Sequence, residues 1–305
     1  MTTGPTRSRA ATEETTGRRR NRSRPPAPEP LPYPVVDNHC HLDIADGPTD
    51  AAAENGGWLD VDAALAASTA VGVPRIVHIG CDLPGARWAV ETARRHEPIV
   101  AAVALHPNEA PRLAATGELG RALAEIDTLA RSSPCVRAVG ETGMDFFRTG
   151  VDGRAAQEES FRSHIRLAHR LDKTLVVHDR DAHADVLRVL DDEGVPARTV
   201  MHCFSADATF ARECLERGCW LSFAGTVTFA NAEPLRAALR VTPLGRVLVE
   251  TDAPYLTAVP YRGRPNASYL VPHTVRAIAG VLDVDLERVC REIDAATDEA
   301  YGGGW

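Results

Sequence analysis

The 305-residue sequence contains almost no lysine, no closely spaced pair of cysteines and no long apolar run. Its seven cysteines are odd in number and scattered, which argues against a disulfide framework or a zinc knuckle and favours buried thiols in a reducing cytoplasm. No window approaches the roughly 18 consecutive apolar residues of a membrane span, and the first residues lack the pattern of a secretion signal. We therefore expect a cytoplasmic protein without a membrane partner.

The chain beyond its first 34 residues is also not basic. Lys173 is the only lysine, and the net charge of the chain is −8. Residues 1–34 hold seven arginines against three glutamates, so the remaining residues carry a net charge of −12. Such a body is not a general nucleic-acid adhesive, which normally shows a basic face. Any anionic substrate must be held locally, by metal ions and a few arginines.

Residues 1–34 differ in composition from the rest of the chain. They are rich in Thr, Arg, Pro and Ser, and the prolines between positions 25 and 32 exclude a helix there. We predict a disordered tail over residues 1–34 and one barrel domain over residues 35–305. An alternative for the tail is that the basic run at 18–22 contacts nucleic acid or another polyanion.

After the tail, short apolar runs alternate with helix-length segments. The runs are rich in Val, Ile and Leu, as parallel strands buried on both faces require. The predicted strands are 34–41, 75–81, 99–105, 136–141, 174–179, 199–203, 219–223 and 246–252. The predicted helices are 58–71, 84–96, 117–131, 155–171, 182–193, 207–217, 232–240, 270–282 and 285–299. Eight strands, each followed by a helix, predict a (β/α)8 TIM barrel of the α/β class.

Two phosphate-binding motifs of other α/β folds are absent. The loop after the first strand lacks GxGxxG, and GxxxxGK[ST] occurs nowhere. This disfavours the nucleotide-binding folds with an open, doubly wound sheet. The loop over residues 43–57 is long and rich in small residues, so we expect it to form a lid or rim of an active site.

Ionisable residues follow most of the predicted strands. Chemistry in such a barrel is located at the carboxyl ends of the strands. Six of these residues make a set of four imidazoles and two carboxylates, which fits a two-metal hydrolytic site. They are His39 and His41 at the end of the first strand, Glu141 at the end of the fourth, His178 at the end of the fifth, His202 at the end of the sixth and Asp252 at the end of the eighth. Each alone has an alternative interpretation as a core histidine or a salt-bridged carboxylate.

The other histidines are harder to interpret. His106 ends the third strand and is either a site residue or part of a His-Pro turn. His78 lies within a strand and is predicted to belong to the core. His96, His164 and His169 lie on or near helix ends, and we expect them on the surface or at helix caps.

Several sequence blocks resemble the TatD family of metal-dependent deoxyribonucleases, within the amidohydrolase-like barrel superfamily. The resemblance covers about residues 35–282 and includes DNHCHLD (37–43), GETGMDFFR (140–148), VVHDRDA (176–182), MHCFSA (201–206), LSFAGTVTF (221–229) and ETDAPYLTAVPYRGRPN (250–266). It implies two divalent ions, magnesium or manganese for the family, although the imidazole-rich set suits zinc equally well. The implied ligands are His39, His41, Glu141 and Asp252 for the first ion and Glu141, His178 and His202 for the second.

The resemblance also implies an activity. The chain is expected to hydrolyse phosphodiester bonds of single-stranded DNA or RNA from the 3′ end, with Asp252 as the base that deprotonates water. Candidate substrate-binding residues are His106, Arg180, Arg262 and Arg264. Alternatives are hydrolysis of another ester or amide, such as D-aminoacyl-tRNA or a small phosphoester, and a non-enzymatic nucleic-acid-binding protein. A monomer is favoured.

Some positions depart from the family pattern. The C-terminal segment DAATDEAYG (294–302) replaces the usual motif and leaves the docking of the last helix open. Related barrel hydrolases that bridge their metals with a carboxylated lysine are disfavoured. Lys173 precedes the fifth strand and therefore lies at the barrel end opposite to the ligands.

Overall fold

Eight parallel strands form the centre of the computed structural model, which describes residues 4–8, 23–46 and 58–305. Neighbouring strands follow the order of the chain, as a singly wound barrel requires. The strands are β2 (Val36–Cys40), β4 (Arg75–Gly80), β5 (Ile99–Val103), β6 (Val136–Asp145), β7 (Thr174–Arg180), β8 (Thr199–Met201), β9 (Trp220–Phe223) and β10 (Val247–Val249). The predicted (β/α)8 barrel and all eight predicted strands are confirmed.

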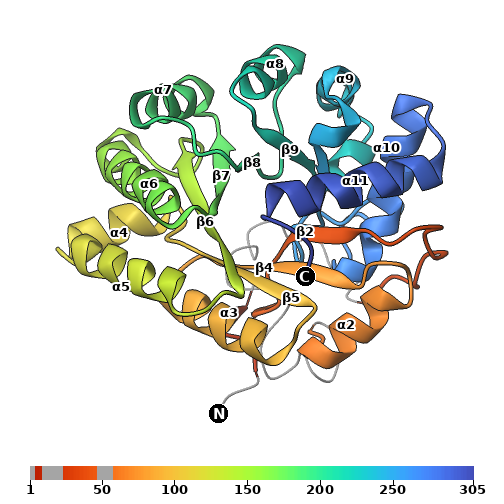
Figure 1. Ribbon diagram of the computed structural model, residues 1–305, viewed down its shortest axis with the longest axis horizontal. Helices are drawn as coiled ribbons and strands as arrows, with labels where there is room; N and C mark the ends of the chain where they lie inside the picture. Colours follow the sequence, from red (N-terminus) through yellow and green to blue (C-terminus); the bar gives the residue numbers. More distant parts are fainter. Residues whose placement is uncertain (1–3, 9–22, 47–57) are drawn as a thin grey trace.

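Helices surround these strands in a ring (Figure 1). They are α2 (Val61–Thr69), α3 (Leu83–Arg95), α4 (Glu109–Ala115), α5 (Leu119–Arg131), α6 (Val151–Leu171), α7 (His183–Glu193), α8 (Ala208–Glu216), α9 (Glu233–Val241), α10 (Val271–Leu282) and α11 (Leu286–Ala300), with 3-10 turns at Gly225–Thr228, Leu244–Arg246 and Ser268–Leu270. Helix α4 was not predicted because it has only seven residues, one of them proline. Within the described part of the chain, no helix is long and apolar enough to cross a bilayer.

The core has two layers. The outer layer lies between strands and helices and contains fully buried side chains such as Phe161 and Ile165 of α6. The inner layer fills the barrel with strand residues such as Val77 and Val176. Side chains of α11, including Tyr301 just after it, join this inner layer. The amino end of the barrel is therefore closed by packed side chains.

Helix α11 docks through polar contacts as well as apolar ones, which answers the question left by its unusual sequence. The Asn38 side chain donates to Thr297 Oγ1 at 3.1 Å, and the Tyr301 hydroxyl donates to the Asn38 carbonyl at 3.2 Å. Arg75, at the start of β4, pairs with Asp294 at 2.5 Å and with Asp298 at 2.7 Å. These contacts hold the last helix against the amino ends of the strands (Figure 1).

We predict that Arg75→Met lowers the free energy of unfolding by about 2 kcal/mol, because two charge-assisted hydrogen-bond partners are lost from a largely buried side chain. Urea denaturation measures the change. The matched control is Arg87→Met, which removes an exposed pair with Glu125 and is expected to change stability by less than about 0.5 kcal/mol. Equal effects of the two substitutions would contradict the assigned role of Arg75.

The barrel closes between its first and last strands through individual hydrogen bonds. The Asp252 amide donates to the His39 carbonyl at 2.9 Å, and the His41 amide donates to the Ala253 carbonyl at 2.8 Å. Further down, Asn38 Nδ2 donates to the Val249 carbonyl at 3.0 Å. The closure thus lies at the same residues that were predicted to bind the first metal ion.

Parts of the predicted tail over residues 1–34 lie against the barrel. Arg7–Ser8 forms a short strand, β1, that pairs in parallel with β3 (Ile44–Ala45). Leu31 is buried, and its amide donates to the Val71 carbonyl at 3.1 Å. The prediction of disorder is therefore wrong for residues 4–8 and 23–34, which lie against the barrel. The basic run at 18–22 and most of the predicted 43–57 rim lie outside the described residues.

Candidate metal centre

Glu141 lies at the centre of the barrel mouth, on β6, and its side chain is 5% exposed. Three imidazoles, from three different strand ends, contact its Oε1 atom. His178 Nδ1 is 2.5 Å away, His202 Nε2 is 2.9 Å away, and His106 Nε2 is 3.4 Å away. One oxygen of a single carboxylate therefore gathers the ends of β5, β7 and β8.

The other oxygen of Glu141 faces the first strand. Its Oε2 atom is 3.5 Å from His39 Nε2. Asp252, directly beyond β10, places Oδ1 3.8 Å from His39 Nε2 and 3.4 Å from His41 Nε2. The structure thus brings together all six predicted metal ligands, with Glu141 between two groups of histidines.

The geometry of these groups fits divalent metal ions. Ligand atoms about 2.1 Å from a tetrahedral ion lie about 3.4 Å apart. The nitrogen-to-oxygen distances around His39, His41 and Asp252 are 3.4–3.8 Å, longer than ordinary hydrogen bonds. Neither ring nitrogen of the fully buried His39 has a hydrogen-bond partner among the described residues. A second compact group contains His106, Glu141 and His178.

Without an ion, the centre is a network of paired charges. Burial opposes the ionisation of Glu141, but the imidazoles of His202 and His106 outweigh it and hold the pKa of Glu141 well below its usual value. Burial is likewise outweighed at Asp252, where His41 lowers the pKa of the carboxyl group. At His178 burial would lower the pKa, but hydrogen bonds from the ring to Asp145 and Glu141 raise it to about 9.

These values predict that metal binding releases protons. At a pH of about 7.5 the metal-free protein holds His178 protonated, because its pKa is about 9 rather than 6.5. An imidazole must be neutral to bind an ion, so protonated His178 weakens metal binding. The affinity of the protein for the metal ion should therefore rise as the pH rises to about 9, by about tenfold per pH unit for each proton released. Calorimetric titration in two buffers of different ionisation enthalpy measures the proton count.

Asp145→Asn is the matched variant for this test. It removes a carboxylate that faces His178 Nε2 at 3.5 Å and leaves Glu141 in place. We expect fewer protons to be released, because the pKa of His178 falls towards its ordinary value. A heat of binding that is independent of the buffer in the wild-type protein would contradict the assignment.

The residues that orient the predicted ligands were not predicted from the sequence. Asp145 faces His178, and Glu250 Oε1 lies 3.1 Å from His202 Nδ1. The His41 Nδ1 atom lies 3.2 Å from the Ile79 carbonyl, so Nε2 is turned toward Asp252. Such partners fix the ring orientation and tautomer of metal-binding histidines. A signal was available for Asp145, because it lies four residues after Glu141 on β6.

His106 takes part in a turn and also contacts Glu141. Its Nδ1 atom accepts a hydrogen bond from the Asn108 amide at 3.1 Å, which forms the turn after β5. Its Nε2 atom points to Glu141. Asn108 in turn donates to Asp145 at 3.3 Å. His106 therefore joins the centre as a seventh ionisable residue, closer to Glu141 than a substrate-contacting role alone requires.

The three predicted substrate arginines occupy different environments. The Arg180 guanidinium lies 3.8 Å from the ring centre of the exposed Phe147, beyond the end of β7. Arg262 lies 4.2 Å from the ring centre of Phe229. Arg264 donates to the Ser23 carbonyl at 3.0 Å and also to the Arg24 carbonyl. Its guanidinium thus holds the N-terminal segment, and its role in substrate binding stays a prediction.

The predicted surface position of His164 is wrong. It was expected on the surface, but its side chain is buried between α6 and the strands. Its Nε2 atom accepts a hydrogen bond from the Leu105 amide at 3.2 Å, and its Nδ1 atom lies 2.7 Å from the Ser160 carbonyl. His78 is fully buried, as predicted. Both are structural histidines outside the metal centre.

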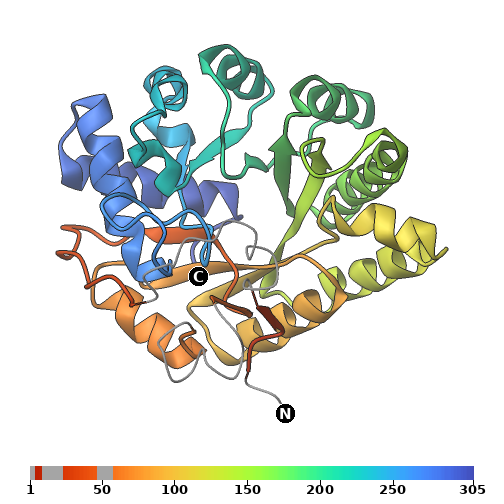
Figure 2. The ribbon, with the colours of Figure 1, turned by 180° about the vertical axis from the view of Figure 1, so that it is seen from behind.

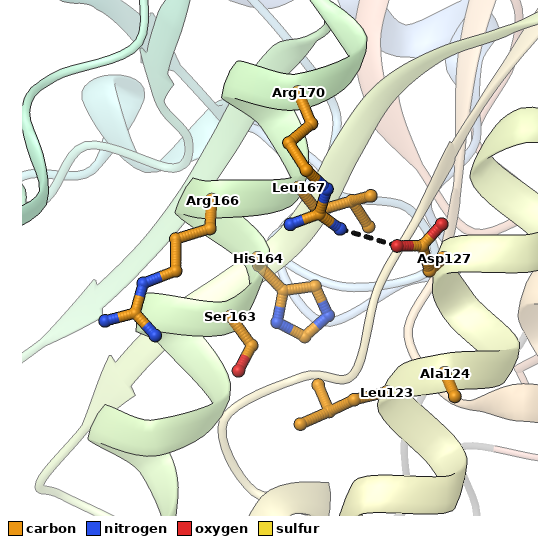
Figure 3. Close-up of a pocket in the computed structure, with 8 residues that line it drawn as sticks. All are labelled: Leu123, Ala124, Asp127, Ser163, His164, Arg166, Leu167 and Arg170. Carbon is orange, nitrogen blue, oxygen red and sulfur yellow. Dashed lines mark hydrogen bonds and ion pairs between the residues drawn. The ribbon is translucent and has the colours of Figure 1, made fainter.

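A hollow of about 310 Å³ lies in the outer layer between α5 and α6 (Figure 3). Its most prominent polar contact is the ion pair between Arg170 and Asp127, at 2.5 Å. Asp127 also pairs with Arg131 along its own helix. Because these charges satisfy one another and the strand ends contribute none of the lining residues, we assign no chemistry to this hollow.

Comparison with known proteins agrees with this centre. The family described as TatD related DNase matches residues 36–302. The metal-dependent hydrolase TatD of Mycobacterium tuberculosis is 43% identical over 277 residues, which cover 89% of this chain and 99% of that protein. The metal-dependent hydrolase YcfH of Escherichia coli is 36% identical, covering 84% and 91%. The crystal structure of YjjV, a TatD homologue from Escherichia coli, has a TM-score of 0.78 at 22% identity, covering 88% and 98%.

Proposed function

This chain belongs to the TatD related DNase family and is a metal-dependent hydrolase, and from this premise we propose that it cleaves phosphodiester bonds of single-stranded DNA or RNA from the 3′ end. The observation that carries the proposal is the position of Glu141. Its Oε1 atom faces His178, His202 and His106 and its Oε2 atom faces His39, as the oxygens of a carboxylate shared by two ions would. Two-ion centres of this kind serve the displacement of phosphate esters.

In this proposal, Glu141 would contribute to both ion sites. His39, His41 and Asp252 would hold the first ion. His178 and His202, which both contact Glu141 Oε1, would hold the second, with His106 beside them. Two divalent ions, magnesium or manganese with zinc as an alternative, would polarise the phosphoryl oxygens and lower the pKa of a water molecule at the site.

Asp252 is the residue proposed to take the proton from that water. Its side chain is 14% exposed, against 5% for Glu141, so it reaches further toward the mouth. In the metal-free protein, burial opposes the ionisation of Asp252, but His41 outweighs it and lowers the pKa of the carboxyl group, so the base is present as a carboxylate. Glu141 is enclosed by imidazoles and is better placed to hold ligands than to exchange protons.

Arg180 and Phe147 are proposed to contact the strand that is cleaved. Phe147 is 63% exposed, although large aromatic side chains are normally buried. The Arg180 guanidinium lies across its ring. An exposed aromatic side chain next to an arginine suits a stacked base and its phosphate.

The test is digestion of single- and double-stranded oligonucleotides labelled at one end, with magnesium, manganese or zinc added to the metal-depleted protein. We expect a ladder that shortens from the 3′ end of the single strand. Parallel reactions with D-aminoacyl-tRNA, a lactone and a small phosphodiester cover the alternative substrates. No cleavage of any oligonucleotide with any ion would overturn the proposed nuclease activity.

A further inference from the structure

The segment 23–34 is fixed against the barrel rather than loosely attached to it. Arg264 donates to the Ser23 carbonyl at 3.0 Å, the Tyr269 hydroxyl donates to the Pro25 carbonyl at 2.6 Å, and Arg276 donates to the Glu29 carbonyl at 2.8 Å. Leu31 is buried in the outer core. Three side chains from the C-terminal half thus set the path of this backbone.

Arg24 lies within this anchored stretch, and it shares a cavity with His41. It lines a small cavity of about 40 Å³ together with the ligand His41 and with Trp58 and Pro254. Its Nε and Nη1 atoms are buried and have no hydrogen-bond partner among the described residues. Buried, unpaired N–H groups of a guanidinium are costly, and nearby Tyr269 and Asp46 only partly offset the burial. An anionic group held beside His41 would satisfy them.

Arg7 reaches the mouth from a second direction. The pairing of β1 with β3 places it there, and Figure 2 shows β1 in dark red at the end of the barrel opposite to α11. Its Nη1 atom lies 3.2 Å from Asp82 Oδ2, while its Nε atom is buried and unpaired within the described chain. Asp82 directly follows Cys81, whose Sγ atom is 3.4 Å from Glu141 Oε2. Arg7 is therefore next to the residues that contact the shared carboxylate.

We propose that Arg24 and Arg7 bind phosphate groups of the substrate, so that the N-terminal segment supplies the cationic rim of the active site. This inference rests on the proposed function. The barrel itself is acidic, and its only lysine, Lys173, begins the segment entering β7 at the opposite end. Arginine suits the task because its planar fork of donors matches the oxygens of a phosphate.

Binding of a fluorescent oligothymidylate to the metal-free protein, followed by anisotropy at several salt concentrations, tests this proposal. Removing one phosphate contact should lower affinity about tenfold and reduce the salt slope by about 0.7 for a single strand. We expect both changes for Arg24→Gln and for Arg7→Gln. Arg24→Lys should keep most of the salt slope, because the charge remains.

The matched control is Arg121→Gln, on the exposed face of α5, which makes the same change in net charge. It should leave affinity and slope unchanged, and thermal melting should show that all variants are folded. Wild-type affinity and slope in both Arg24→Gln and Arg7→Gln would overturn the inference. No binding of the probe by the wild-type protein would overturn it too.

The two proposals can fail separately. In one outcome, the wild-type protein binds the probe and both variants bind it more weakly, but the metal-loaded wild-type protein cleaves no oligonucleotide. The phosphate-binding rim is then supported and the nuclease activity is contradicted. If the wild-type protein cleaves and the two variants retain its binding and its KM, the nuclease activity stands and the rim fails.

Discussion

Replacing Glu141 with alanine is expected to lower kcat/KM on a single-stranded oligonucleotide by about a thousandfold or more. The substitution removes both carboxylate oxygens at once. On one side His178, His202 and His106 lose their common partner, and on the other His39 does. The remaining imidazoles then face one another without the negative charge that would hold them around two cations. Steady-state kinetics and the metal content of the purified variant measure the loss.

Two further substitutions calibrate this result. Glu250→Gln removes the charge behind His202 but keeps a hydrogen-bond acceptor, so a smaller loss in metal affinity, about 10- to 100-fold, is expected. Glu216→Ala, on the exposed part of α8, should behave as wild type. Wild-type rates in Glu141→Ala would exclude the shared-carboxylate centre.

Gly143→Ala is expected to damage both the fold and the centre. Gly143 has a φ of +142°, and an added Cβ would lie 2.0 Å from the carbonyl oxygen of His178. The two residues are partners in the β6–β7 ladder, so the contact cannot be relieved by a side-chain rotation. We expect a loss of about 3 kcal/mol or more in unfolding free energy, together with weaker metal binding, because the backbone that carries His178 must shift.

The matched glycine for this test is Gly120, near the start of α5. A Cβ there would meet no atom within 4 Å, so Gly120→Ala should be neutral or stabilise the protein by up to about 1 kcal/mol. Chemical denaturation gives the stability, and calorimetric titration gives the metal affinity. A Gly143→Ala protein with wild-type stability and metal affinity would show that the two strands can separate at this point without cost.

Local periodicity carried most of the fold prediction. The eight apolar runs and nine of the helices follow from spacings of two and of three to four residues, which depend only on neighbouring positions. Helix α4 escaped detection because its short sequence, EAPRLAA, has no sustained period. The prediction of disorder for residues 23–34 was wrong for a related reason. Composition shows that residues 23–34 cannot form a helix, but it does not show that Arg264, Tyr269 and Arg276 hold them in an extended path.

The predictions for single histidines also differed in outcome. His39, His41, His178 and His202 were predicted to lie together because each stands at the end of a predicted parallel strand, and the carboxyl ends of such strands meet at one mouth. His164 was placed wrongly because its polar side chain and its position on a helix suggested the surface, although Phe161, Leu167 and Ala168 lie on the same helix face; the packing of α6 against β6 buries it. Its partner Leu105 is 59 residues away along the chain.

The sequence by itself predicted which ionisable side chains meet at the barrel mouth and the order in which the barrel presents them. The tertiary structure decided how they are arranged: which oxygen of Glu141 each imidazole faces, that Asp145 and Glu250 lie beside His178 and His202, and that Arg24 lines a cavity with His41 while Arg264 holds the N-terminal segment. The reason is physical. Strand periodicity and chain order act over a few residues, whereas the direction of a side chain at the mouth depends on contacts between segments far apart in the sequence.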